Sequence, residues 1–99
     1  MERIFNIRMN VPLGCRNGTL SFTKNGEQFI EGMLCLFQNK TPLTGKLSPD
    51  GEISFSGQII TLIRTFPYQA QGTVDGGKIK LEVIGDRSHF IITGEEVTP

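Results

Sequence analysis

The stretch Gly72-Thr-Val-Asp-Gly-Gly77-Lys-Ile-Lys-Leu-Glu-Val-Ile-Gly85 decides the fold of this chain. Its apolar residues Ile79, Leu81 and Val83 alternate with charged residues, which is the period of a β-strand with one buried face. The triplet Asp75-Gly-Gly77 in front of them is typical of a tight turn between antiparallel strands. The stretch therefore predicts a β-hairpin.

Two further stretches follow the same plan. One spans residues 18–32 and has a turn at Asn25-Gly26, and the other spans residues 45–57 and has a turn at Ser48-Pro-Asp-Gly51. We expect a type I′ turn at Asn25-Gly26, because both residues tolerate a positive φ angle. No segment repeats its apolar residues at helical spacing, so the chain is predicted to be all-β.

The expected strands are short and follow one another along the chain. They cover approximately residues 3–10, 19–23, 28–37, 43–47, 52–60, 64–74, 78–83 and 89–93. We expect residues 11–18 to form an extended turn region and Gly32 to be a bulge or bend point. The polar tail from residue 95 onward is expected to fray.

Closure of the sheet hides the strand edges that would otherwise be open to solvent. Seven or eight short strands joined in sequence achieve this most simply as a closed antiparallel meander. We therefore expect a single small β-barrel domain over residues 1–99. The layout resembles calycin-type up-and-down barrels, and this resemblance concerns architecture alone.

Charge and hydropathy exclude several classes of partner. Ten basic residues balance ten acidic ones, so there is no overall field to attract nucleic acid. The longest apolar run, Met33 to Phe37, is too short to cross a bilayer, and residues 1–9 lack the apolar core of a signal peptide. We therefore expect a cytoplasmic protein without nucleic-acid or membrane partners, in which Cys15 and Cys35 stay reduced.

Residues that commonly hold metals and cofactors are sparse in this sequence. There is a single histidine, the two cysteines lie far apart, and the carboxylates are scattered. No glycine belongs to a phosphate-binding motif between a strand and a helix. We expect no metal and no cofactor.

Arg64, Tyr68 and His89 are the candidate ligand-binding residues. If the strand over residues 64–74 is regular, Arg64 and Tyr68 share the apolar face, where a guanidinium at the barrel mouth would bind a carboxylate or phosphate. The alternative for Arg64 is that Pro67 shifts the register, so that Arg64 is solvated or pairs with a surface carboxylate. The alternative for His89 is an outward strand position, which follows if Phe90 faces the core. The sequence leaves both open.

Two stretches are apolar on both faces and need a cover on the outside as well as in the core. They are Met33 to Phe37 and Ile59 to Ile63. A second copy of the chain would provide the cover in a homodimer that contacts itself through Met33, Phe37 and Leu62. The alternative cover is the loop over residues 11–17.

Three functions compete at this point. The first is a non-enzymatic barrel that binds a small apolar or anionic molecule, since small barrels often offer a lined cavity. The second is a structural or interaction subunit that forms a homo-oligomer without a ligand. The third, ranked last, is an isomerase or decarboxylase that uses Arg64, Tyr68 and His89 on a small acid.

Overall fold

A computed structural model describes residues 2–11, 14–36, 39–60, 65–85 and 89–97 of the chain. The described residues form antiparallel β-strands that follow one another along the sequence. The strands are β1 (Glu2–Val11), β2 (Gly14–Asn25), β3 (Phe29–Leu36), β4 (Asn39–Leu47), β5 (Glu52–Ile60), β6 (Thr65–Asp75), β7 (Lys78–Ile84) and β8 (His89–Glu96).

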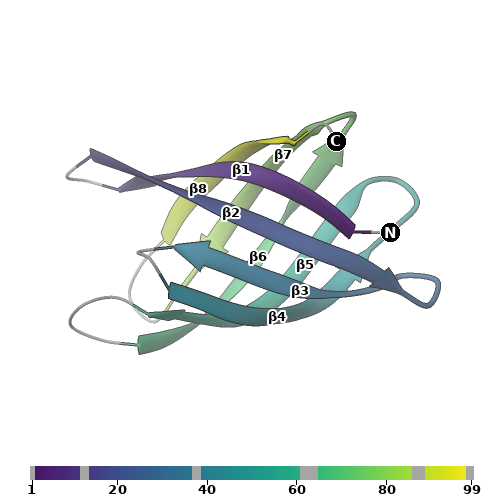
Figure 1. Cartoon of the computed structure of the whole chain (residues 1–99), viewed down its shortest axis with the longest axis horizontal. Helices are drawn as coiled ribbons and strands as arrows, with labels where there is room; N and C mark the ends of the chain where they lie inside the picture. The colour runs from purple at the N-terminus through teal and green to yellow at the C-terminus, as the bar shows by residue number, and fades with distance from the viewer. Residues whose placement is uncertain (1, 12–13, 37–38, 61–64, 86–88, 98–99) are drawn as a thin grey trace.

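Each strand pairs with the next one along the chain, and β8 pairs with β1, so the sheet closes into a barrel (Figure 1). The closing pair is antiparallel, and Phe5 to Met9 of β1 lie opposite Glu96 to Ile92 of β8. The predicted all-β meander and its closure are confirmed. The closed sheet leaves no strand edge unpaired along this seam.

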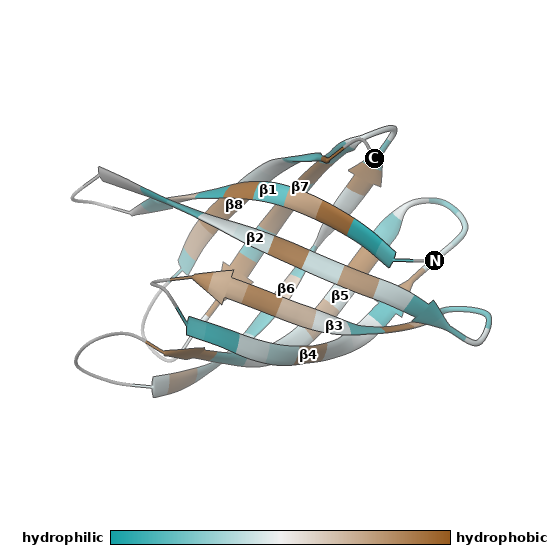
Figure 2. Ribbon diagram, in the orientation of Figure 1, coloured by the Kyte–Doolittle hydropathy of each residue, from teal (hydrophilic) through white to brown (hydrophobic). Residues whose placement is uncertain are grey.

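The barrel is filled by apolar side chains from alternate positions of every strand, which produces the alternating colours along the strands in Figure 2. One continuous core results. Its buried members are Phe5, Ile7, Met9, Leu20, Phe22, Ile30, Leu34, Leu36, Leu43, Ile53, Phe55, Ile59, Phe66, Tyr68, Ala70, Ile79, Leu81, Val83 and Ile92.

Two of the predicted turns are confirmed and one is wrong. Asp75 lies opposite Lys78, so Gly76 and Gly77 form a two-residue link. At the 48–51 turn the Gly51 N–H donates to the Ser48 carbonyl over 3.0 Å, and Gly51 has a φ of 91°. The type I′ turn at Asn25-Gly26 does not form, because Asn25 pairs with Phe29 across a loop of residues 26–28.

The strands are longer than the sequence predicted at three places. β2 begins at Gly14, because residues 14–18 continue the pairing with β1 beyond the point where the turn residues predicted its end. Residues 14–17 therefore belong to β2 and are not part of a separate loop that covers an apolar face. β4 begins at Asn39, and β8 continues to Glu96 because its end pairs with β1.

Regular pairing also removes the predicted bulge and the register shift. Gly32 pairs one-for-one with Phe22 and with Leu43, so it is not a bulge. A Cβ at Gly32 would collide with the Ser21 carbonyl oxygen, which shows that the two backbones approach closely there. Pro67 lies opposite Gln58 in an uninterrupted register, so it shifts nothing.

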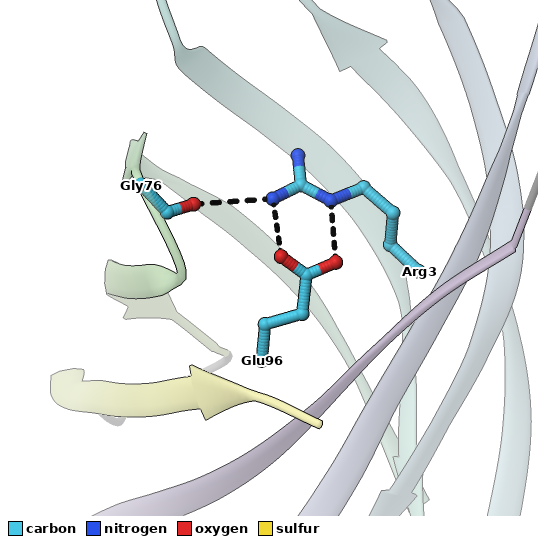
Figure 3. Close-up of polar contacts among 3 residues, drawn as sticks. All are labelled: Arg3, Gly76 and Glu96. Atoms are coloured by element: carbon cyan, nitrogen blue, oxygen red, sulfur yellow. Dashed lines mark hydrogen bonds and ion pairs between the residues drawn. The ribbon is translucent and has the colours of Figure 1, made fainter. Parts of the chain in front are cut away.

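A polar clasp joins the first and last strands at one end of the barrel (Figure 3). Arg3 donates from Nε and Nη2 to the two carboxylate oxygens of Glu96 over 2.9 and 2.8 Å, and Nη2 also donates to the Gly76 carbonyl over 3.3 Å. The Arg3 guanidinium also lies 5.2 Å from the centre of the Phe5 ring. The hydrogen bond from Arg3 lowers the pKa of the Glu96 carboxyl and raises that of Arg3.

Candidate functional site

Tyr68 lies on the inner face of β6, between Phe66 and Ala70, as the sequence predicted for a regular strand. It is 3% exposed, and its ring meets the Phe55 ring edge-on at a centroid distance of 6.0 Å. The hydroxyl is buried and has no hydrogen-bond partner among the described residues. Burial raises the pKa of Tyr68, so the phenol remains neutral.

The other two predicted site residues do not join Tyr68 in the described structure. Arg64 lies outside the described residues. His89 is exposed on the outer face of β8, and its Nε2 is 3.5 Å from Oε1 of Glu82. Because Tyr68 points into the barrel and His89 points out of it, these two do not form a common binding or catalytic site.

The interior of the barrel is occupied by the chain's own side chains. The exposed fractions of the buried core residues run from 0% at Phe5 to 8% at Phe66. A cavity of ligand size would expose to water the side chains that line it. Within the described strands, therefore, no such cavity opens onto the core.

A surface groove runs across strands β4 to β7 on the outside of the barrel. Its floor includes Gly57 and the backbone of Leu43 and Tyr68, whose side chains point inward, and its walls are the outward residues on either side of them. None of its lining residues is charged. The residues are Pro42, Leu43, Thr44, Ser56, Gly57, Gln58, Pro67, Tyr68, Gln69, Ile84 and Gly85.

Chemistry-bearing clusters are also missing from the described part of the chain. No group of three or more His, Cys, Asp or Glu side chains is placed to hold a metal ion there. Cys35 is a free thiol on the outer face of β3 and is partly buried. Among the same residues, no helix has the length and apolar character needed to cross a bilayer.

Three of the five large exposed apolar side chains among the described residues lie along one line on the barrel exterior. The large exposed ones among the described residues are Ile4, Phe29, Met33, Ile84 and Val97. Ile4 pairs with Ser21, Ser21 with Met33, and Met33 with Pro42. The Val97 N–H donates to the Ile4 carbonyl over 2.8 Å, which places Val97 at the end of the same line.

We call Val97, Ile4, Met33 and Pro42 the outer apolar row. It crosses β1, β3 and β4 and ends just past β8, and only the partly buried Ser21 of β2 interrupts it. Ile4, Met33 and Val97 are each about 40% exposed, at 40%, 40% and 41%. Groups of exposed apolar side chains with a polar rim are typical of protein interaction surfaces, and here Val97 adjoins Ile4 and Met33 adjoins Pro42.

The two flanks of the outer apolar row differ in charge. On one side, two residues along each strand, lie Glu2, Thr23, Glu31 and Thr44. On the other side lie Glu95, Asn6, Thr19, Cys35 and Lys40. One flank is therefore acidic, and the other carries the acidic Glu95 at its β8 end and the basic Lys40 at its β4 end, diagonal to Met33.

The sequence predicted only part of this surface. Met33 was identified from the two-faced apolar stretch and is indeed on the outside, whereas Phe37 and Leu62 lie outside the described residues. Ile4 and Val97 were missed. The signal for Ile4 was present, because an isoleucine at that position is out of phase with Phe5 and Ile7 and must lie on the polar face.

Comparison with known proteins adds no assignment to this geometry. No protein-family model, no curated protein and no solved structure matches the chain.

Proposed function

We propose that the protein is a non-enzymatic interaction subunit that associates with a second copy of itself through the outer apolar row. The observation that carries this proposal is the alignment of Ile4, Met33 and Val97 on one cross-strand line of the outer face. Burial of such side chains releases about 25 cal/mol per Å² of apolar surface removed from water. A zero net charge means that two copies do not repel each other overall.

A second copy fits the part of this surface around Met33, because the charges on the two sides of Met33 are complementary. Glu31 lies on one side of Met33 and Lys40 on the other, so two identical surfaces can match this acidic residue with this basic one. Symmetric dimers that use the same patch on both subunits are the commonest oligomers. The proposal places the dimer in the cytoplasm, where the thiol of Cys35 would remain reduced.

The experiment is sedimentation velocity over a range of protein concentrations. We expect the wild type to dimerise and Met33→Glu to weaken the dimer at least tenfold, because a buried unpaired carboxylate is costly. The matched control is Ile84→Glu, which changes a side chain that is 48% exposed on β7, off the row. A wild type that stays monomeric at the highest concentration reached contradicts the proposal, as does equal weakening by both variants. Circular dichroism confirms that each variant is folded.

One observation favours a second function, the binding of a small molecule that accepts a hydrogen bond from Tyr68. A buried hydroxyl without a partner costs free energy that an acceptor oxygen would recover. A Cβ at Gly57 would lie 3.0 Å from this hydroxyl, so a ligand would enter only if β4 and β5 moved apart beside it. Native mass spectrometry of protein isolated from its own cells tests this function. A bound mass that disappears in Tyr68→Phe supports it, and wild-type protein without any bound mass counts against it.

A further inference from the structure

We propose that the two copies meet at Met33 with their two-fold axis along the outer apolar row, so that Glu31 of each copy lies beside Lys40 of the partner subunit. This inference rests on the self-association proposed above and specifies its geometry. Met33 is the centre because it is the exposed apolar residue of the row whose two flanks carry opposite charges on adjacent strands.

The register of β3 and β4 fixes where these charges lie. Glu31 is two residues from Met33 along β3, and Cys35 is two residues away in the opposite direction. Lys40 lies directly opposite Cys35 on β4. Residues in a strand rise about 3.4 Å each and neighbouring strands are about 4.8 Å apart, so Lys40 is one strand spacing from the Cys35 position.

The two charges are too far apart to pair within one copy. Four residues of strand separate Glu31 from Cys35, which is about 14 Å along the strand. Among the described residues Lys40 forms no ion pair, and the Glu31 carboxylate accepts only a 3.5 Å hydrogen bond from Asn25. Both side chains are exposed, so both are free to meet a second molecule.

The charges select one of two ways to turn the partner. A half-turn about an axis along the row exchanges the two flanks, and Glu31 then lies over Cys35 of the partner subunit and next to Lys40 of the partner subunit. A half-turn about an axis along β3 keeps each flank on its own side and places Glu31 on Glu31 of the partner subunit. Like charges in contact oppose the second arrangement, and opposite charges favour the first.

Charge reversal tests this arrangement. Sedimentation equilibrium at low salt compares the wild type with Glu31→Lys, Lys40→Glu and the double variant. We expect each single change to weaken the dimer roughly tenfold, about 1.4 kcal/mol, and the double change to restore it, because the two pairs are rebuilt with reversed polarity. Glu52→Lys and Lys80→Glu, which change exposed charges on β5 and β7, are the matched controls and should have no effect.

The outcomes separate this inference from the proposed function. A wild-type dimer that is insensitive to the single changes, or that the double change fails to restore, overturns the arrangement and leaves self-association intact. A monomeric wild type overturns both.

A second measurement uses the thiol of Cys35. In the proposed arrangement the two copies of Cys35 lie on opposite sides of the axis, too far apart for a disulfide. In the arrangement about β3 they face each other. We expect mild oxidation of a Cys15→Ser variant to give no covalent dimer, and rapid formation of one through Cys35 overturns the inference.

Discussion

At the scale of single residues, Tyr68 is the most unusual side chain of the barrel. Its ring is ordinary core material and packs edge-on against Phe55. Its hydroxyl, in contrast, is buried without a partner, whereas buried polar groups in proteins are almost always hydrogen-bonded. The hydroxyl therefore destabilises the barrel in the form described, and a phenylalanine would fill the same space without this cost.

Replacement of Tyr68 with phenylalanine is expected to stabilise the protein by about 1 kcal/mol at neutral pH. Burial raises the pKa of Tyr68 in the folded state. Below the ordinary phenol pKa of about 10 the phenol is neutral in both states, and above that pH it ionises in the unfolded state, so the free energy of unfolding of the wild type falls. The gap between variant and wild type should therefore widen in alkali. Urea unfolding at several pH values measures it, and a variant less stable than the wild type at neutral pH would show that the hydroxyl has a partner.

The same residue offers a direct optical measurement of its ionisation. Tyr68 is the sole tyrosine and the chain has no tryptophan, so the near-ultraviolet absorption of phenolate reports this side chain alone. In folded protein the phenolate signal should be absent around pH 10, and in concentrated guanidinium chloride it should appear there.

At the scale of the strands, glycine allows neighbouring backbones to approach each other closely. Gly32 lies in the middle of β3 on its inner side, opposite Phe22 and Leu43. The Ser21 carbonyl oxygen occupies the place where a side chain at residue 32 would begin. The strong curvature of the sheet in a small barrel depends on such positions, because any residue with a side chain would hold the strands apart there.

Gly32→Ala is expected to destabilise the barrel by more than about 2 kcal/mol, because the new methyl group collides with fixed backbone and not with a flexible side chain. The matched control is Gly77→Ala. A Cβ at Gly77 meets nothing closer than the Cβ of Glu96 at 3.7 Å, so this change should alter stability by less than about 1 kcal/mol. Thermal or urea unfolding compares the two, and similar losses from both would contradict this account.

The strands themselves were predictable because their inner faces alternate. The start of β5 at Glu52 and the start of β7 at Lys78 follow directly from this alternation and the turn residues before them. The start of β2 did not follow, because Asn17 and Gly18 are typical turn residues that here pair with Arg8 and Ile7. Pairing with a neighbouring strand is a long-range contact, and local composition does not contain it.

The candidate surface was less predictable for the same reason. A sequence shows which side chains share a face of one strand, but the outer apolar row runs across strands. Its members come from residues 4, 33, 42 and 97, and only the register of the closed sheet aligns them. The expected pairing of Arg64 with Tyr68 remains a prediction, because Arg64 lies outside the described residues.

At the scale of the whole molecule, the clasp between Arg3 and Glu96 closes the seam between the first and last strands. The two side chains are about 30% exposed, at 31% and 29%, so water screens their attraction. The bidentate geometry and the Gly76 carbonyl favour one orientation of the guanidinium. The clasp therefore makes a modest contribution to the free energy of unfolding, and this contribution depends on the charge of Glu96.

Glu96→Gln is expected to lower stability by about 0.5 to 1 kcal/mol at neutral pH. Because the pKa of Glu96 is lowered in the folded state, its contribution is present above the ordinary carboxyl pKa of about 4.3 and is lost as the pH falls. The difference from the wild type should therefore vanish in acid. Glu95→Gln, a change to the neighbouring outward carboxylate, is the control for urea unfolding at neutral and acid pH. Equal losses from the two variants would assign no role to the clasp.

Because β1 pairs with β8, every strand of the barrel has two neighbours, and only β8 and β1 are neighbours that no connecting segment of the chain joins. The Val97 N–H bonds to the Ile4 carbonyl, so the two ends of the described chain lie side by side. A short linker can therefore join them, and the ring can be opened instead at the exposed loop between Gly26 and Glu27. Such a circular permutant should keep every strand pairing of the natural barrel. The permutation changes which strand comes first along the chain, but each strand keeps the same two neighbours in the sheet.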